Sequence, residues 1–268
     1  MSQSPVQSLS KALAVLNAVA SFDAPATIAA IAARTGVPRP TAYRLVASLQ
    51  AEGYLLEVDG GYVIGFELLP LAAALLDKNP LRLAALPHLQ ALSERTGERT
   101  NLGILQRGRV MILGGFERPS LPTIYSRFGR AIPAHRSALG KALLSQLPVE
   151  DVAAIVGPEP FAQSTARTIT SMDVLLADLE ETRRRGYAAE NGENSETSRC
   201  IAALIAPEDG TALGAISIST SVRTGADVSE FVEDLLRTAE VIAHVARGYR
   251  KQEPSRRRVA RRRDPVAG

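Results

Sequence analysis

The sequence contains one cysteine, Cys200, and three histidines, His88, His135 and His244, which together could supply a thiol nucleophile and a general base. The local motifs of such chemistry are missing: there is no Gly-x-Ser-x-Gly elbow, no paired-histidine metal motif and no glycine-rich phosphate loop. One cysteine cannot form an internal disulfide or a zinc site of several thiolates. We therefore expect no catalytic centre, metal site or cofactor, and a Cys-dependent enzyme is the least favoured alternative.

Cationic and polar side chains offer a second kind of chemistry, the binding of nucleic acid. Residues 39–50 (RPTAYRLVASLQ) repeat apolar residues at helical spacing, and the opposite side holds two cations and two bulky residues: Arg39, Pro40, Tyr43 and Arg44. Guanidinium groups and helix-end amides bind phosphates, and the start of such a helix reaches base edges. This segment is therefore a candidate DNA-reading helix.

The elements around this helix must position it on DNA. Apolar spacing predicts two earlier helices, over residues 6–20 and 28–34, and Gly36 suits the left-handed turn before the third. Two alternating runs then flank Asp59-Gly60-Gly61 and predict a β-hairpin. Residues 1–65 are thus expected to form a winged helix-turn-helix domain. A helical bundle without a DNA role remains the alternative, because this segment has no net charge.

Residues 66–79 are mostly apolar but too few to span a bilayer. They predict a linker helix that packs on its own domains or pairs with a second subunit, and Pro70 marks its start or a kink. Residues 80–249 are expected to be α+β. Helices are predicted over residues 81–96, 137–147, 172–185 and 228–249, and strands over residues 100–105, 110–115, 123–128, 199–206 and 213–220.

The basic charge of the chain is concentrated at its C-terminal end. The formal net charge is +3, with a pI of about 9.2. Residues 250–268 alone carry +6, residues 1–65 are neutral, and residues 66–249 carry −3. A run of arginines without apolar periodicity is expected to be a disordered tail. It would serve as a solubilising end or attract phosphates without sequence specificity.

The N-terminal segments QSLSKALAVLNAV, IAAIAARTGVPRPTAYRLVASLQAEGYL and GYVIGFELL resemble those of IclR-type bacterial transcription regulators, and the similarity extends over about residues 6–249. The resemblance implies that Arg39, Thr41, Tyr43 and Arg44 contact operator DNA. Thr41 and Arg44 match the family pattern. Pro40 replaces its usual serine and deletes a hydroxyl and an N–H that could bind phosphate, although proline fits a first helical turn.

The same resemblance implies a GAF-like effector-binding domain. The stretches that carry it are His135-Arg-Ser-Ala-Leu-Gly140-Lys141, Gly186-Tyr187 with Cys200-Ile-Ala, and Ala215-Ile-Ser217-Ile-Ser219. By position, the pocket wall would come from Ile132, Ala138 and Leu139, and the polar contacts from Glu190, Cys200, Ser217 and Ser219. Ser217 and Ser219 alternate on a strand, so their hydroxyls face one side. The expected pocket offers an acid and hydroxyls but no assured cation, so the sequence favours a neutral effector as much as an acidic one.

These expectations describe a regulator in which a small molecule, organic or aromatic acid-like by resemblance, modulates the binding of operator DNA. The protein would act as a homodimer or a dimer of dimers, to match two-fold related half-sites. No secretory signal or membrane span is visible, so we expect a cytoplasmic protein. A DNA-binding module with a ligand-blind second domain remains the alternative.

Overall fold

The computed structural model describes residues 6–117, 131–207, 212–221 and 227–250. The chain divides into two compact units, residues 1–78 and residues 79–268. The strand expected over residues 123–128 and the tail from residue 251 onward lie outside the described residues. Arg250, which was expected to begin that tail, is the last residue of a helix.

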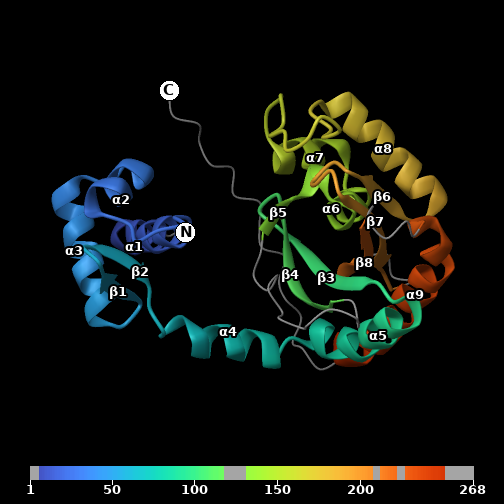
Figure 1. Ribbon diagram of the computed structural model, residues 1–268, viewed down its shortest axis with the longest axis horizontal. Helices are drawn as coiled ribbons and strands as arrows, with labels where there is room; N and C mark the ends of the chain where they lie inside the picture. The colour runs from blue at the N-terminus through green and yellow to red at the C-terminus, as the bar shows by residue number, and fades with distance from the viewer. Residues whose placement is uncertain (1–5, 118–130, 208–211, 222–226, 251–268) are drawn as a thin grey trace, which may run out of the picture. The chain divides into compact units, whose positions relative to one another are not determined.

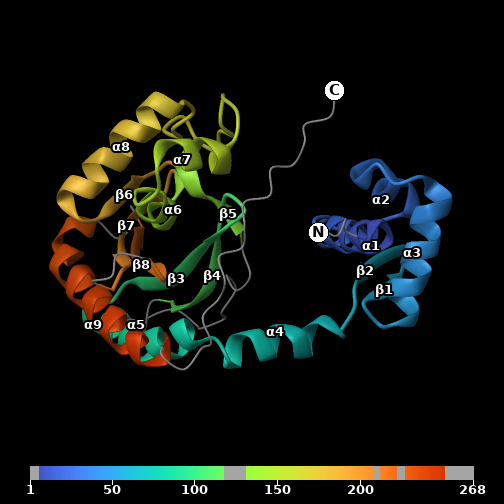
Figure 2. The same cartoon turned by 180° about the vertical axis from the view of Figure 1, so that it is seen from behind.

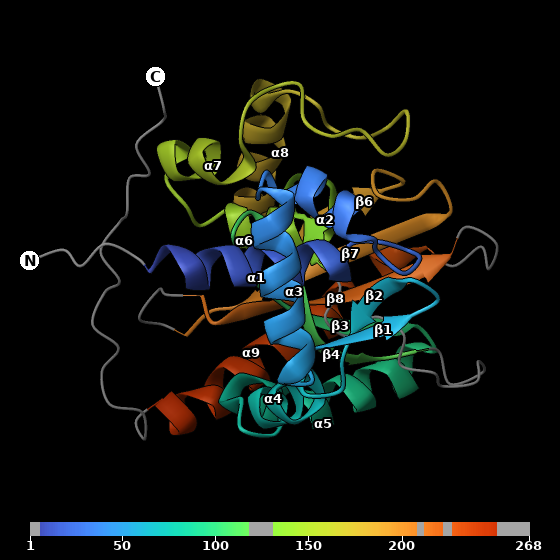
Figure 3. The same cartoon turned by 90° about the vertical axis from the view of Figure 1, so that its left-hand side faces the viewer.

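Three helices and a hairpin form most of the first unit. They are α1 (Gln7–Ala20), α2 (Ile28–Thr35), α3 (Arg39–Ala51), β1 (Leu55–Val58) and β2 (Gly61–Ile64). Figure 3 shows α3 crossing α1. The helices and the hairpin share one apolar core, which includes Val15, Ile31, Val46 and Leu55. This order of elements confirms the predicted winged helix-turn-helix.

The turns of this unit form where the sequence predicts them. The Thr27 side chain caps α2 by accepting a hydrogen bond from the amide of Ala30 at 3.2 Å. Gly36 ends α2 in the left-handed conformation with φ 69°. Asp59 and Gly60 both have positive φ, 51° and 74°, as a tight two-residue hairpin turn requires.

Helix α4 (Leu68–Asp77) follows the hairpin, and none of its residues is buried. It begins two residues before Pro70, which therefore occupies the first turn, where its missing N–H costs no hydrogen bond. Leu69, Leu71 and Leu75 are 64%, 56% and 62% exposed. The predicted linker helix is thus an apolar helix on which three leucines face solvent in the single chain.

The second unit is built on a six-stranded antiparallel sheet in the order β5-β4-β3-β8-β7-β6 (Figure 1). Its strands are β3 (Arg99–Gln106), β4 (Arg109–Phe116), β5 (Ala131–Pro133), β6 (Ala188–Asn191), β7 (Ser198–Ile205) and β8 (Gly214–Ser221).

Helices cover both faces of this sheet (Figures 1 and 2). On one face lie α5 (Pro80–Thr96) and α9 (Val232–Arg250), the latter preceded by the 3-10 turn η3 (Val228–Phe231). On the other lie the 3-10 turn η1 (Ala134–Arg136), α6 (Ala138–Leu144), α7 (Val149–Val156) and α8 (Met172–Arg185). An apolar core fills the space on each side. The expected α+β architecture is confirmed.

Several details differ from the expected elements. Helix α6 ends at Leu144 rather than near Leu147, and the long closing helix starts with a 3-10 turn. The sequence did not predict β5, β6 and α7, which are short elements of three, four and eight residues. None of the described helices is both long and apolar enough to cross a membrane.

Candidate functional site

Helix α3 presents the candidate DNA-contacting residues on its outer side. Ala42 and Val46 are buried against the core, whereas Arg39, Tyr43 and Arg44 are exposed and Thr41 is half-buried. The helix therefore presents two cations and a phenol toward solvent.

The start of α3 has no side-chain cap. Pro38 precedes the helix and provides no side-chain cap, so no cap acceptor occupies the amides of Arg39 and Thr41. Pro40 is exposed and has no N–H to offer. Free amides at a helix N-terminus attract phosphate in general.

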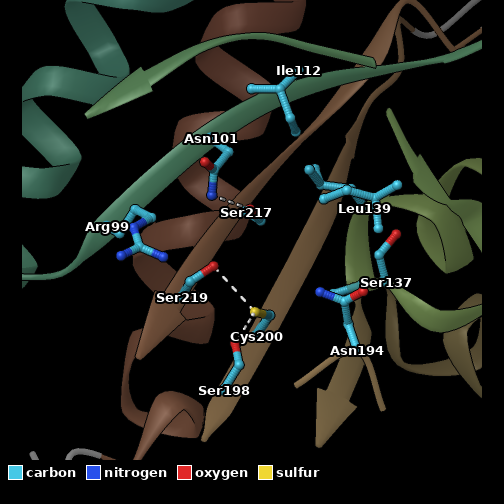
Figure 4. A pocket seen from close by; sticks show the side chains of 12 residues that line it. Arg99, Asn101, Ile112, Ser137, Leu139, Asn194, Ser198, Cys200, Ser217 and Ser219 are labelled. Carbon is cyan, nitrogen blue, oxygen red and sulfur yellow. Dashed lines mark hydrogen bonds between the residues drawn. The ribbon is translucent and has the colours of Figure 1, made fainter. Parts of the chain in front are cut away.

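The second unit contains a pocket between the sheet and the start of α6 (Figure 4). It holds about 540 Å³ of space, including its open mouth. Six of the seven residues proposed from the resemblance line it: Ile132, Ala138, Leu139, Cys200, Ser217 and Ser219. The six lining residues that were not predicted as pocket residues are Arg99, Asn101, Ile112, Ser137, Asn194 and Ser198.

Small side chains on this face of the sheet leave room for the pocket. Ala202 and Ala215 belong to the core under α6, whereas Ile201, Ile216 and Ile218 point to the core under α5 and α9. Adjacent strand residues alternate between faces, so large residues face one side and small or hydroxyl-bearing residues the other. Helix α6 approaches the small-residue side closely, and the space beyond its N-terminus remains open.

Strand register brings the polar residues into rows. Residues paired across neighbouring strands share a face, and the pairs Arg99 with Ser219, Ser219 with Cys200, and Cys200 with Glu190 form one row across β3, β8, β7 and β6. Asn101 and Ser217 pair in the adjacent row. The pocket therefore has a guanidinium at one end of a hydroxyl and thiol strip.

Hydrogen bonds fix this strip in place. Cys200 Sγ donates to Ser219 Oγ at 3.1 Å and lies 3.3 Å from Ser198 Oγ. Asn101 Nδ2 donates to Ser217 Oγ at 3.2 Å (Figure 4). Because each hydroxyl can donate and accept, the strip can serve a ligand with either kind of polar group.

The start of α6 forms the opposite wall. Ser137 Oγ accepts a hydrogen bond from the Gly140 amide at 3.1 Å and caps the helix, which places Ala138 and Leu139 at the pocket. Gly140 packs directly on the η1 backbone: a Cβ there would lie 2.1 Å from the Ala134 carbonyl oxygen. Only glycine allows this close approach.

Glu190 differs from its expected position. It is 2% exposed and does not line the pocket, since its Oε1 accepts hydrogen bonds from the amides of Glu193 at 2.5 Å and Asn194 at 3.0 Å. An oxygen that accepts from two amides has less capacity for a ligand. Glu190 interacts with Cys200 and with the amide of Asn194, so it contacts two lining residues from outside the pocket.

A buried lysine ties that loop to α6. Lys141 is 1% exposed, and its Nζ lies 2.7 and 2.9 Å from the Glu193 oxygens and 2.7 Å from Asp178 Oδ2 on α8. Burial raises the pKa of Glu193, and the Lys141 ammonium opposes that rise. This ion cluster joins α6, α8 and the 190–194 loop behind the pocket.

Cys200 is unsuited to nucleophilic catalysis. Burial and the Glu190 carboxylate raise its pKa to about 12, so the group is a thiol at neutral pH. Burial lowers the pKa of His135, whose Nε2 lies 3.2 Å from the Ala162 carbonyl oxygen rather than beside Cys200. His88 and His244 lie on α5 and α9, against the other face of the sheet. No histidine in the described residues is therefore paired with the thiol.

The pocket contains a cation, Arg99, whereas the sequence assured none. Arg99 lies at the start of β3, two residues before Asn101, and both face the pocket. The alternation of positions 99 and 101, and of positions 198 and 200, is the sequence signal that could have identified three of the missed residues. Asn194 and Ser137 precede or follow regular elements and give no such signal.

Family models match both units of the chain. Residues 8–59 match the IclR helix-turn-helix domain, and residues 73–244 match the C-terminal domain of the bacterial transcriptional regulator IclR. The HTH-type transcriptional regulator XynR of Escherichia coli is 29% identical over 248 residues, 91% of this chain and 98% of that protein. The transcriptional repressor IclR of the same organism is 29% identical over 251 residues, 91% of this chain and 92% of that protein.

A solved structure of similar fold carries a ligand. An IclR homologue from Microbacterium hydrocarbonoxydans, complexed with 4-hydroxybenzoate, is 28% identical, with a TM-score of 0.72 over 90% of this chain and 99% of that one. The chain therefore belongs to the IclR family of DNA-binding transcriptional regulators, which have an effector domain and are not enzymes.

Proposed function

We propose that this regulator binds, through α3, an operator whose half-sites are related by a two-fold axis. It releases or engages this operator when a small organic acid occupies the effector pocket. The observation that carries the proposal is the pocket itself, an apolar wall facing a strip of convergent hydrogen-bonding groups. A ligand that binds the DNA-competent and DNA-incompetent states with different affinity would act as the switch.

On the DNA side, we assign operator contacts to Arg39, Thr41, Tyr43 and Arg44, with Pro40 contributing shape only. Their exposure on the outer side of α3 supports this assignment. Arg44→Ala should weaken operator binding and lower its salt dependence by about one counterion. Unchanged specific affinity and salt slope in a mobility-shift titration would contradict it.

We further propose that the exposed apolar face of α4 pairs with its equivalent in a second subunit. Leu69, Leu71 and Leu75 would be costly to leave in water, and a dimer matches an operator with two half-sites. Leu75→Glu should shift the sedimentation profile toward monomer. The assembly would be a dimer or a dimer of dimers, acting in the cytoplasm, where operator DNA lies.

The effector is proposed to contact Ile132, Ala138, Leu139, Cys200, Ser217 and Ser219 directly, and Glu190 indirectly through the 190–194 loop. The 4-hydroxybenzoate bound by the homologue supports an aromatic or organic acid. Thermal shift of the full chain against such acids tests this, because a ligand of the native state raises its stability. Absence of any shift across a broad millimolar panel would favour a ligand-blind second domain.

A further inference from the structure

Arg99 differs from the other described lining residues because it carries a positive charge, and it lies at the β3 end of the polar row. Its side chain is 25% exposed, and its Nε lies 2.6 Å from Glu117 Oε2. Within the described part of the chain, its two terminal nitrogens form no hydrogen bond. Figure 4 shows these nitrogens on the side of Ser219. The Nε of the guanidinium thus donates to Glu117, and its two terminal nitrogens can donate hydrogen bonds to a planar anion.

The charges beyond the other end of the polar row make Arg99 the preferred place for an anion. There the Lys141 ammonium is paired with the carboxylates of Glu193 and Asp178, and a third carboxylate, that of Glu190, contacts the Glu193 backbone amide. If all three are ionised, that end carries an excess of negative charge, and it repels an anion at short range. Arg99 and Cys200 are two strands apart, or about 10 Å. That distance suits a small molecule with its acid at one end and a hydroxyl or carbonyl at the other.

We propose that Arg99 recognises the carboxylate of the effector and so determines that the pocket selects anions over their neutral counterparts. Glu117 is then the counter-ion of Arg99 when the pocket is empty, and it competes with the ligand. Asn101, Ser217 and Ser219 form hydrogen bonds with the remaining polar groups of the effector. This inference rests on the proposed effector-binding function and adds the residue that sets charge specificity.

The test compares acids with their uncharged amides on matched variants. Calorimetric titration of the full-length protein uses 4-hydroxybenzoate, benzoate and lactate, each against its primary amide, at up to millimolar concentration. The variants are Arg99→Gln, Arg99→Lys and Glu117→Gln. Arg109→Gln is the matched control, since Arg109 begins the neighbouring strand and does not line the pocket. Thermal unfolding of each variant establishes that it is folded.

The native protein should prefer at least one acid over its amide by about 10-fold or more, the value of one charge-assisted hydrogen bond. Arg99→Gln should weaken that acid about 10- to 100-fold and leave the amide within about 3-fold. Arg99→Lys should retain part of the preference, because it keeps the charge but loses the planar fork. Glu117→Gln should strengthen acid binding by removing the competing carboxylate, and Arg109→Gln should change neither ligand.

The failure of this inference is distinguishable from failure of the proposed function. If acids bind but Arg99→Gln leaves their affinity unchanged, or weakens acid and amide equally, the assignment of Arg99 is overturned and the effector pocket stands. An increase in acid affinity on Arg99→Gln, or a decrease on Glu117→Gln, overturns it as well. If no acid or amide binds the native protein, both the effector proposal and this assignment are overturned.

Discussion

Lys141→Met would remove the ammonium that separates the carboxylates of Glu193 and Asp178. Its Nζ lies within 2.9 Å of three carboxylate oxygens, and the residue is 1% exposed. Methionine has a similar length and an adaptable apolar chain, so the substitution changes charge more than packing. The two carboxylates would be left behind without their shared counter-ion.

The expected loss of stability is large for a single substitution. Removing one partner of a buried ion pair costs about 3–5 kcal/mol. Because Asp178 keeps 24% exposure of its side chain, we expect the lower half of that range. For a unit of this size, each kcal/mol lowers the unfolding midpoint by about 2–4 °C, so the midpoint should fall by about 6–16 °C.

The loss should also depend on pH, with a definite sign. Burial raises the pKa of Glu193 in the folded state, and removal of Lys141 would raise it further. Between the unfolded and the raised folded pKa, the folded state binds a proton that the unfolded state does not, so stability falls as pH rises through this window. The Lys141→Met deficit should therefore be larger at pH 7.5 than at pH 5.5.

Differential scanning calorimetry of the full-length protein at both pH values measures this. Arg184→Met is the matched control: it removes an exposed ion pair with Glu181 on α8, the same helix that carries Asp178, and should have little effect. A Lys141→Met deficit below about 1 kcal/mol, the range of surface pairs, would refute the reasoning. So would a deficit that does not change between the two pH values.

Three further outcomes are expected. Gly140→Ala should destabilise the second unit by at least about 1–3 kcal/mol in urea unfolding, because its Cβ would overlap the Ala134 carbonyl, and a cost of a few tenths would contradict that packing. Alkylation of Cys200 by iodoacetamide should be slow at pH 7 and still accelerate above pH 9, as its pKa of about 12 requires, whereas a plateau near pH 8 would contradict it. Deletion of residues 251–268 should lower non-specific DNA affinity and its salt slope while sparing operator choice in competition binding, and lost discrimination would show that the tail reads sequence.

Local sequence signals were sufficient for most elements of the fold. The Thr27 cap, the Gly36 turn and the Asp59-Gly60 hairpin depend on residues within a few positions of each other, so the chain pattern predicts them. The same holds for α8, whose predicted ends agree with the structure. Short elements such as β5 and β6 could not be predicted, because neighbouring strands rather than their own sequence stabilise them.

The sequence by itself determined the order of elements, the outward-facing side of α3 and the position of Ser217 and Ser219 on one face of their strand. Each of these follows from the periodicity of the residues. Tertiary structure decided what surrounds those hydroxyls. Asn101 donates to Ser217 across 116 positions, and register alone brings Arg99 into the row of Ser219 and Cys200. Tertiary structure also places Glu190 outside the pocket lining, because its Oε1 accepts hydrogen bonds from two loop amides. Alternation places Arg99 on the same strand face as Asn101, but only the register of the folded sheet brings that face beside Ser219.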